Sequence, residues 1–332
     1  MSAQAWVNRL WYQRRYPPLW AVPASLLFGA LVALRRALYR RGWLRQVRLA
    51  RPVIVVGNLS VGGTGKTPLV CWLSGQLRMR GLSPGIVTRG HGGSERAPQL
   101  ISVDGDPSEH GDEPVMMVRR TGRPVAVGRD RPAAAQLLID AGCDVILSDD
   151  GLQHYALARD CEVIVVDGDR RFGNGWVLPA GPLREPKSRL AGADAVVVNG
   201  GGGLLPGALA MKLDGDRAVA MLDGRSRSLS EFTGSAVHAI AGIGNPERFF
   251  NMLRAHGVQV LGRALDDHAV LTAEMIRFGD EQPVLMTEKD AVKCAGLVDE
   301  RHYYVPVAAQ FTPADAASLL ATVERALGRA AA

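Results

Sequence analysis

Short apolar runs alternate with helical patterns through the first two thirds of the chain. The runs show no polar alternation, and segments such as 131–141 between them carry apolar residues at helical spacing. Wholly apolar strands joined by helices indicate a parallel sheet with both faces covered. The strand candidates of this unit are residues 53–56, 85–88, 124–127, 145–147, 163–166 and 195–198.

A second unit follows the glycine run 200–203. Residues 237–241 form a strand candidate, and Asn245-Pro246-Glu247 predicts a helix start, because proline suits the first helical position. Residues 258–261 complete a β-α-β pattern. Further along, 284–286 and 303–307 are strand candidates, and 314–327 has a helical pattern.

Residues 1–51 are a basic leader rich in tryptophan and tyrosine. Residues 19–34 form an apolar run that is flanked by arginine pairs and interrupted by Pro23 and Gly29. The run is short for a membrane span, which needs roughly 20 residues. A buried helix of a globular domain is the alternative, whereas a signal peptide fits poorly with the arginines that follow. We expect an uncleaved helix that lies in or dips into the cytoplasmic leaflet.

Charge is distributed unevenly along the chain. The first 94 residues hold fourteen Lys or Arg and no Asp or Glu, whereas the following 238 hold 25 basic and 33 acidic residues. A basic front end favours an anionic surface such as phospholipid headgroups or nucleic acid. The four cysteines have no metal-ligand spacing and indicate buried thiols in a reducing compartment.

A glycine-rich loop joins the first strand candidate to a helical pattern. It contains the sequence Gly62-Gly63-Thr64-Gly65-Lys66-Thr67, and this strand, loop and helix context is typical of a Walker A motif. Backbone N–H groups of such a loop surround a polyphosphate. We expect Lys66 to reach the β- and γ-phosphates and Thr67 to bind Mg²⁺. The one departure is Ser60, where the strict pattern has glycine. The predicted nucleotide-binding residues are Ser60, Val61, Gly62, Gly63, Thr64, Gly65, Lys66 and Thr67.

Acidic residues follow two of the strand candidates. Asp149 and Asp150 come directly after the strand near 147, where a Walker B site supplies a carboxylate to Mg²⁺; a solvated turn or helix cap is the alternative. Asp167-Gly168-Asp169 follows the strand 163–166, and we favour a turn there. Asn199 opens a glycine run that is typical of a connector.

Three further segments carry candidate chemistry. Asp112 lies where a helix cap would, and it is equally a candidate base that faces the γ-phosphate. Arg184 and Glu185, in a proline-rich loop, are candidate contacts for phosphate and Mg²⁺. His268 follows two aspartates after a strand candidate, and a carboxylate there could orient its imidazole.

Taken together, these residues resemble the tetraacyldisaccharide 4′-kinase family, which acts in lipid A biosynthesis. The matching segments span the chain from the leader to the second unit. They are 57–68, Arg89-Gly90, Gly111-Asp112-Glu113-Pro114, 149–154, 179–186, Asp267-His268 and 287–293.

The resemblance implies that ATP phosphorylates the 4′-hydroxyl of tetraacyldisaccharide 1-phosphate to form lipid IVA at the cytoplasmic face of the inner membrane. It implies that Asp112 is the base with His268 as its partner, and that Thr67, Asp149, Asp150 and Glu185 serve Mg²⁺. The expected fold is α/β, with a P-loop NTPase-like parallel sheet domain, a smaller α/β domain and an N-terminal membrane-associated helix. The expected bounds are 1–45 for the leader, 46–195 for the kinase domain with helix 312–330 returning to it, and 205–300 for the second domain, with hinges near 196–204 and 301–311.

Two other classes of protein share some of these features. Membrane-associated partitioning ATPases have a similar glycine loop, but they carry a lysine where this chain has Val61, and their membrane helix is usually C-terminal. Nucleic-acid surfaces interleave basic and polar groups, whereas the arginines here bracket an apolar run. We therefore expect a monomeric enzyme whose partners are a lipid substrate and a phospholipid surface, with no nucleic acid.

Overall fold

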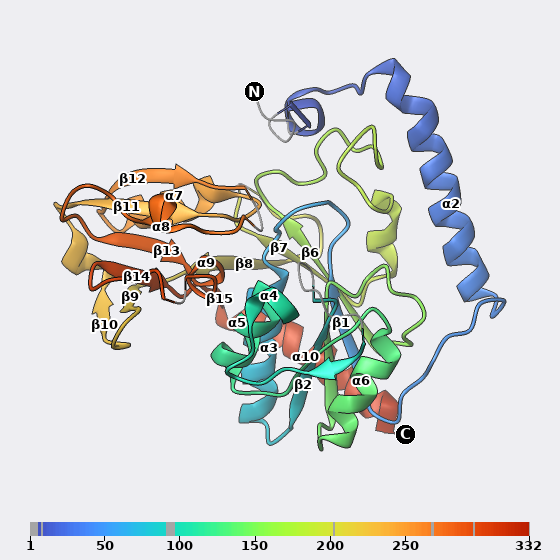
Figure 1. Cartoon of the computed structure of the whole chain (residues 1–332). Helices are drawn as coiled ribbons and strands as arrows, with labels where there is room; N and C mark the ends of the chain where they lie inside the picture. The colour runs from blue at the N-terminus through green and yellow to red at the C-terminus, as the bar shows by residue number, and fades with distance from the viewer. Residues whose placement is uncertain are drawn as a thin grey trace.

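The computed structural model describes residues 6–7, 9–90, 97–201, 203–266, 269–294 and 296–331. Two sheets organise these residues, as Figure 1 shows. The larger sheet has nine strands, in the order β15 (Ala308–Gln310), β8 (Leu209–Asp214), β7 (Ala195–Asn199), β6 (Cys161–Asp167), β1 (Val53–Gly57), β5 (Val145–Asp149), β2 (Pro84–Thr88), β4 (Val125–Val127) and β3 (Gln99–Leu100).

The strands from β7 to β4 run parallel to one another, which confirms the predicted parallel sheet. Alternate residues of β1 face opposite sides, so Ile54 and Val56 join one core while Val53 and Val55 join another. The helices α3 (Lys66–Met79), α5 (Asp112–Thr121) and α10 (Pro313–Ala331) cover the first face. Helix α6 (Arg131–Asp140) and the segment 152–193 cover the second.

The second sheet has six strands and forms a smaller α/β domain. Its order is β10 (Ser226–Ser228), β9 (Arg217–Ala220), β14 (His302–Val305), β13 (Val284–Thr287), β11 (Ala236–Ala241) and β12 (Gln259–Ala264). Helix α7 (Pro246–Ala255) inserts Phe249, Phe250 and Leu253 into its core. The remaining short helices are α4 (Pro107–His110), α8 (Ala273–Ile276) and α9 (Glu288–Ala291).

The chain passes between the two sheets at positions that differ from the expected bounds. Strand β8 pairs with β7 in the first sheet, although 205–300 was expected to form the second domain. The chain therefore leaves the first sheet after Asp214 and re-enters it at Ala308. Strand β8 reads LAMKLD, and its exposed Lys212 interrupts the apolar run that marks the other strands of this sheet.

The leader forms α2 (Val22–Arg40), which lies along one edge of the larger domain (Figure 1). Ser25 Oγ donates a hydrogen bond to the Val177 carbonyl oxygen at 2.7 Å, and Trp11 Nε1 donates to the Pro179 carbonyl oxygen at 3.1 Å. The outer face of α2 leaves large apolar side chains more than half exposed, which argues against a buried globular helix. These side chains are Leu26, Leu27, Leu31 and Leu34.

Candidate active site

The loop between β1 and α3 is bent tightly at two glycines. Gly62 and Gly65 have φ angles of 101° and 96°, which L-residues with a side chain rarely adopt. A Cβ atom on Gly65 would also lie 2.5 Å from Asn199 Nδ2. Both positions therefore require glycine for the loop to close.

Side chains hold the carbonyl groups of this loop. Asn58 Nδ2 donates to the carbonyl oxygens of Ser60 at 2.7 Å and Gly62 at 3.3 Å, and Asn199 Nδ2 donates to that of Thr64 at 2.9 Å. Because the C=O and N–H of one peptide unit point in opposite directions, the N–H groups face the other side of the loop. Such an arrangement is suited to binding an anion.

The first turn of α3 meets the two aspartates at the end of β5. Val56 is in register with Asp149, so the glycine loop and the carboxylates share the carboxyl edge of the sheet. Thr67 Oγ1 donates to Asp149 Oδ2 at 2.8 Å. Lys66 Nζ lies 3.5 Å from Asp150 Oδ1. The structure thus brings together four residues that the sequence predicted for the site.

The two aspartates have opposite electrostatic environments. Burial, with a contribution from Glu113, raises the pKa of Asp149 to about 6. Burial alone would also raise the pKa of Asp150, but Lys66 and Arg184 outweigh it and hold this pKa below its ordinary value. Asp150 also has a φ of 49°, a strained backbone conformation of the kind that clusters at functional sites.

One oxygen of Asp149 provides a test of whether this site suits a cation. Asp149 is 1% exposed, and its Oδ1 has no hydrogen-bond partner among the described residues. Among the described residues, no group of three or more His, Cys, Asp or Glu side chains forms a metal site made of protein ligands alone. The site fits Mg²⁺, which is usually held by one or two carboxylates together with substrate phosphates and water.

The proline-rich loop separates its two candidate residues. Arg184 Nη1 bonds both carboxylate oxygens of Asp150 at 3.0 Å, so it joins the Lys66 cluster. Glu185 is buried, and its Oε2 accepts a hydrogen bond from Tyr155 at 2.7 Å and lies 3.5 Å from Arg189 Nε. Its Oε1 is buried and has no hydrogen-bond partner among the described residues, so Glu185 stays a predicted Mg²⁺ ligand.

Asp112 is the first residue of α5 and is 7% exposed. The preceding Gly111 has a φ of 91°, which turns the chain sharply into the helix. The neighbouring Glu113 is close enough to Asp149 to raise its pKa, and it forms a 3.1 Å ion pair with Lys289 of the second domain. The predicted partner, His268, lies outside the described residues.

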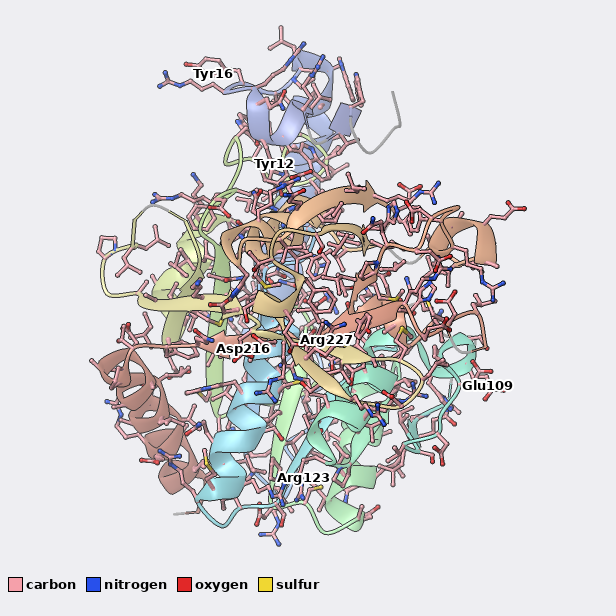
Figure 2. The ribbon with its side chains drawn as sticks, turned by 90° about the vertical axis from the view of Figure 1, so that its left-hand side faces the viewer. Tyr12, Tyr16, Glu109, Arg123, Asp216 and Arg227 are labelled. Atoms are coloured by element: carbon pink, nitrogen blue, oxygen red, sulfur yellow. The ribbon has the colours of Figure 1, made fainter. Side chains whose placement is uncertain are left out.

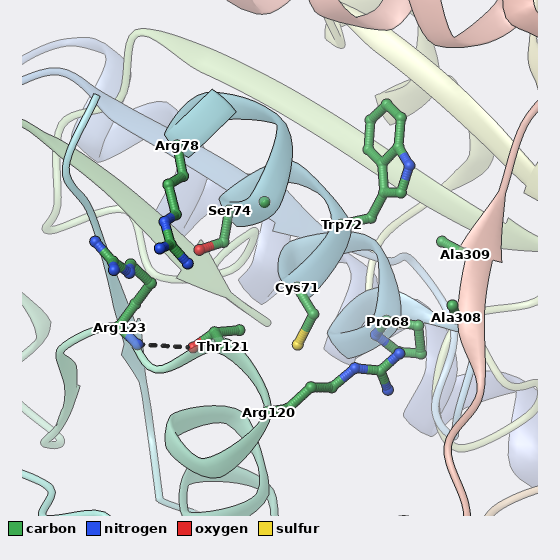
Figure 3. A pocket seen from close by; sticks show the side chains of 11 residues that line it. Pro68, Cys71, Trp72, Ser74, Arg78, Arg120, Thr121, Arg123, Ala308 and Ala309 are labelled. Carbon is green, nitrogen blue, oxygen red and sulfur yellow. Dashed lines mark hydrogen bonds between the residues drawn. The ribbon is translucent and has the colours of Figure 1, made fainter. Parts of the chain in front are cut away.

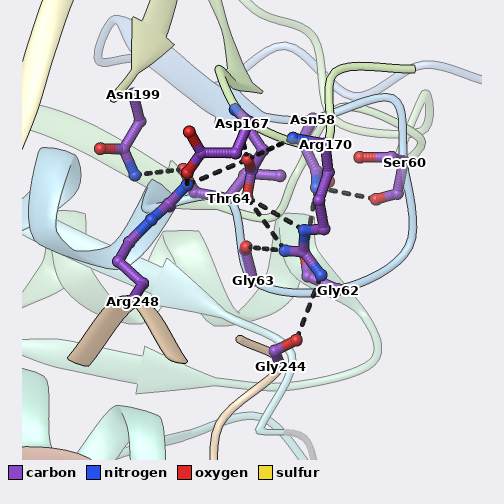
Figure 4. A network of polar contacts seen from close by, with 11 residues as sticks. Asn58, Ser60, Gly62, Gly63, Thr64, Asp167, Arg170, Asn199, Gly244 and Arg248 are labelled. Atoms are coloured by element: carbon purple, nitrogen blue, oxygen red, sulfur yellow. Dashed lines mark hydrogen bonds and ion pairs between the residues drawn. The ribbon is translucent and has the colours of Figure 1, made fainter. Parts of the chain in front are cut away.

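Sequence reasoning missed a polar network at the end of β6, which Figure 4 shows. Asp167 is 1% exposed, and its Oδ2 accepts hydrogen bonds from Arg170 at 3.1 Å. Arg248 of α7 donates to Asp167 Oδ1 and to Asp169, each at 2.9 Å. This network is more than the turn that was expected there, and it binds the second domain to the edge of the sheet.

Arg170 extends this network to the glycine loop. Its guanidinium donates to the carbonyl oxygen of Gly63 at 2.6 Å and to that of Gly244, in the second domain, at 3.1 Å. A Cβ atom on Gly244 would lie 2.8 Å from the Gly63 nitrogen. The second domain therefore rests directly on the phosphate-binding loop. The only indication of this contact in the sequence was that polar residues follow each strand.

Arg131, at the start of α6, is a buried residue of this edge of the sheet. It is 3% exposed and donates to the Asp149 carbonyl oxygen at 2.9 Å and to Ser148 Oγ at 3.1 Å. Burial lowers its pKa to about 10, which still leaves the guanidinium charged at neutral pH. Arg131 thus fixes the backbone at the end of β5.

The parallel sheet, glycine loop, lysine and paired aspartates define a P-loop nucleotide-binding enzyme of the phosphotransferase class. The family model for tetraacyldisaccharide-1-P 4′-kinase matches residues 18–325. A tetraacyldisaccharide 4′-kinase of Alkalilimnicola ehrlichii is 50% identical over 94% of this chain and 95% of its own length. One from Methylobacillus flagellatus is 46% identical over 98% and 97%.

The fold has a relative among solved structures. A crystal structure of an "apo" form of LpxK from Aquifex aeolicus in complex with ATP superposes with a TM-score of 0.76. It is 26% identical and covers 92% of this chain and 98% of its own. The chain belongs to the tetraacyldisaccharide-1-P 4′-kinase family and is a kinase.

Proposed function

We propose that this kinase transfers the γ-phosphoryl group of ATP to the 4′-hydroxyl of tetraacyldisaccharide 1-phosphate at the cytoplasmic face of the inner membrane, forming lipid IVA. The observation that carries the proposal is the junction of Lys66 and Thr67 with Asp150 and Asp149, on a chain whose leader exposes an apolar helix. The names of the relatives give the acceptor class.

Nucleotide and metal would share the carboxyl edge of the larger sheet. The glycine loop would bind the phosphates through its N–H groups, and Lys66 would neutralise charge that develops on the transferred phosphoryl group. Thr67 and Asp149 would hold Mg²⁺, since Asp149 Oδ1 is buried and has no partner among the described residues. Magnesium would neutralise phosphate oxygens when bound. Asp150 would position Lys66 and Arg184.

Asp112 would accept the proton of the attacking hydroxyl. It is largely buried at the first turn of α5, beside Glu113, whose charge acts on Asp149. The family motif makes His268 its partner. A positioned base of this kind contributes about 10²–10⁴-fold to the rate.

The membrane would hold both the enzyme and its acylated substrate. Helix α2 belongs to a 22-residue segment, Leu19–Arg40, whose length and composition would also suffice to cross a bilayer. We place it in the interface, because one side is attached to the protein through Ser25 while leucines are exposed on the other. Basic residues at both ends of the segment would contact anionic headgroups.

Single-turnover transfer from labelled ATP to purified tetraacyldisaccharide 1-phosphate in detergent micelles tests this function. We expect labelled lipid with the wild type and at least a 100-fold lower rate with Asp112→Asn. The matched control is Asp104→Asn, an exposed aspartate of the loop before α4, which should leave the rate unchanged.

Other outcomes would revise the proposal in distinct ways. Transfer at the wild-type rate by Asp112→Asn would keep the kinase and remove Asp112 as the base. ATP hydrolysis without labelled lipid, stimulated by bare membranes, would instead support the switch-ATPase class.

A further inference from the structure

A cavity lies along α3, and none of the residues that line it belongs to the glycine loop or to the aspartate pair. It has a volume of about 270 Å³ and is bounded by α3, by the end of α5 and by β15. Figure 3 shows its polar side, where Arg78, Ser74 and Arg123 lie together, and its apolar side, which includes Trp72 and Ala309. A cavity of this volume is large enough for a small anion.

Three guanidinium groups line this cavity, and none of the described residues that line it carries a carboxylate. Arg120 forms a 2.9 Å ion pair with Glu288, which lies in α9 of the second domain. Over the residues that the structure describes, Arg78 and Arg123 form no ion pair. Two arginines without an acidic partner in one concave site favour an anion, because guanidinium groups match phosphate and carboxylate oxygens geometrically.

Two buried donors in the cavity wall also lack partners. Ser74 is 1% exposed, and its Oγ makes no hydrogen bond with any described residue. The buried Nε of Arg123 likewise makes no hydrogen bond with any described residue. Polar groups that are buried in native proteins are nearly always hydrogen-bonded, so the wall of the cavity holds two unused hydrogen-bond donors.

The position of the cavity favours a soluble anion over a lipid headgroup as the source of acceptor oxygens. In Figure 2, the leader residues Tyr12 and Tyr16 lie at one end of the molecule and Arg123 lies at the other. We propose that the cavity binds a soluble anion that bears one or two phosphate groups. Oxygens of the anion would accept hydrogen bonds from the guanidinium groups of Arg78 and Arg123.

Arg120 connects this site to the second domain. The same guanidinium that lines the cavity holds Glu288 across the domain interface, where Glu288 is largely buried. A bound anion and Glu288 compete for Arg120, so occupancy of the cavity weakens one of the ionic contacts between the domains. The anion would therefore loosen the Arg120–Glu288 contact between the domains.

The test is equilibrium dialysis of ³²P-labelled inorganic phosphate against the full-length protein in detergent. The glycine loop is kept saturated with Mg²⁺ and a non-hydrolysable ATP analogue, so that it does not bind the label. We expect saturable binding of about one phosphate per chain. We expect Arg78→Gln with Arg123→Gln to weaken it by at least about tenfold, since each removes a charge-assisted hydrogen bond. Arg225→Gln, at an exposed arginine of the second domain, is the control and should change nothing.

Two further variants keep the proposal falsifiable. Arg78→Gln alone changes an exposed side chain and should fold normally, with phosphate bound about threefold or more weakly. Glu288→Gln releases Arg120 and should tighten binding about threefold. The proposed site would be wrong if the wild type showed no saturable phosphate binding. It would also be wrong if Arg78→Gln, alone and together with Arg123→Gln, bound phosphate as tightly as the wild type. Unchanged affinity in Glu288→Gln would overturn the competition.

Discussion

Arg170 donates a 2.6 Å hydrogen bond to the carbonyl oxygen of Gly63 in the phosphate-binding loop. The same guanidinium is held by buried Asp167 and reaches the Gly244 carbonyl oxygen of the second domain at 3.1 Å. One side chain therefore fixes the loop that binds nucleotide and the domain that lies over it. The glycine loop and the second domain are therefore physically linked at this residue.

Replacing Arg170 should weaken nucleotide binding more than it weakens folding. In Arg170→Gln the Gly63 carbonyl loses its charged donor, while Asp167 keeps Arg248 as a partner. We expect the KM for ATP to rise about tenfold, the usual cost of a charge-assisted hydrogen bond. Steady-state kinetics at saturating lipid measures it, with Arg225→Gln as the control. An unchanged KM would show that the loop holds its shape without Arg170.

The two aspartates of β5 should respond differently to Mg²⁺. Asp149→Asn removes the charge of the carboxylate whose buried Oδ1 has no partner among the described residues. We therefore expect the Mg²⁺ concentration for half-maximal activity to rise at least about tenfold. Asp150→Asn should lower the rate by releasing Lys66 and Arg184 and leave the Mg²⁺ requirement near that of the wild type. Titrations of activity with Mg²⁺ separate the two. Equal shifts in both variants would make Asp150 a metal ligand as well.

The exposed face of α2 should determine membrane binding without stabilising the fold. Changing Leu26, Leu27, Leu31 and Leu34 to Gln removes apolar area that is already exposed, so the thermal midpoint in detergent should stay constant. Partitioning onto vesicles that contain anionic phospholipid should fall about 100-fold or more. Leu222→Gln with Leu261→Gln, on exposed positions of the second domain, is the control for vesicle flotation. Undiminished flotation of the α2 variant would place the membrane contact elsewhere.

Acid should destabilise the protein partly through His154. Burial, assisted by Arg131 and Arg159, lowers the pKa of this imidazole from 6.5 to about 4. Between those values the unfolded chain binds more protons than the folded one, so stability is present above pH 6.5 and is lost as the pH falls toward 4.

His154→Gln should remove this dependence. From about pH 7 to about pH 5, we expect the thermal midpoint of the wild type to fall about 2 °C further than that of the variant. Thermal melts at both pH values measure the difference. Parallel falls in the two proteins would mean that His154 is solvated enough to titrate normally.

Local patterns in the sequence are sufficient to predict the larger sheet and the phosphate-binding loop. Buried parallel strands are uninterrupted apolar runs, and a loop that must adopt positive φ needs glycine at fixed positions, so both features are visible within a few residues. Asp149 and Asp150 could be placed for the same reason, because they follow directly after such a strand. The class of enzyme follows from the glycine loop, the strands around it and the motifs beside them.

Long-range contacts were decided only by the tertiary structure. Asp167, Arg170 and Arg248 come from two domains, and no periodicity relates them. Strand β8 has a charged residue in its run and joins the larger sheet through its pairing with β7. The contacts of Glu185 with Tyr155 and Arg189 likewise depend on how the loop folds back.

The sequence by itself therefore determined the class of fold, the nucleotide loop and the amphiphilic leader, because each is encoded by neighbouring residues. The tertiary structure decided which face of the leader helix is exposed, where the chain passes between domains, and which arginines hold the site together. These features depend on side chains that are far apart in sequence and meet only when both sheets have formed.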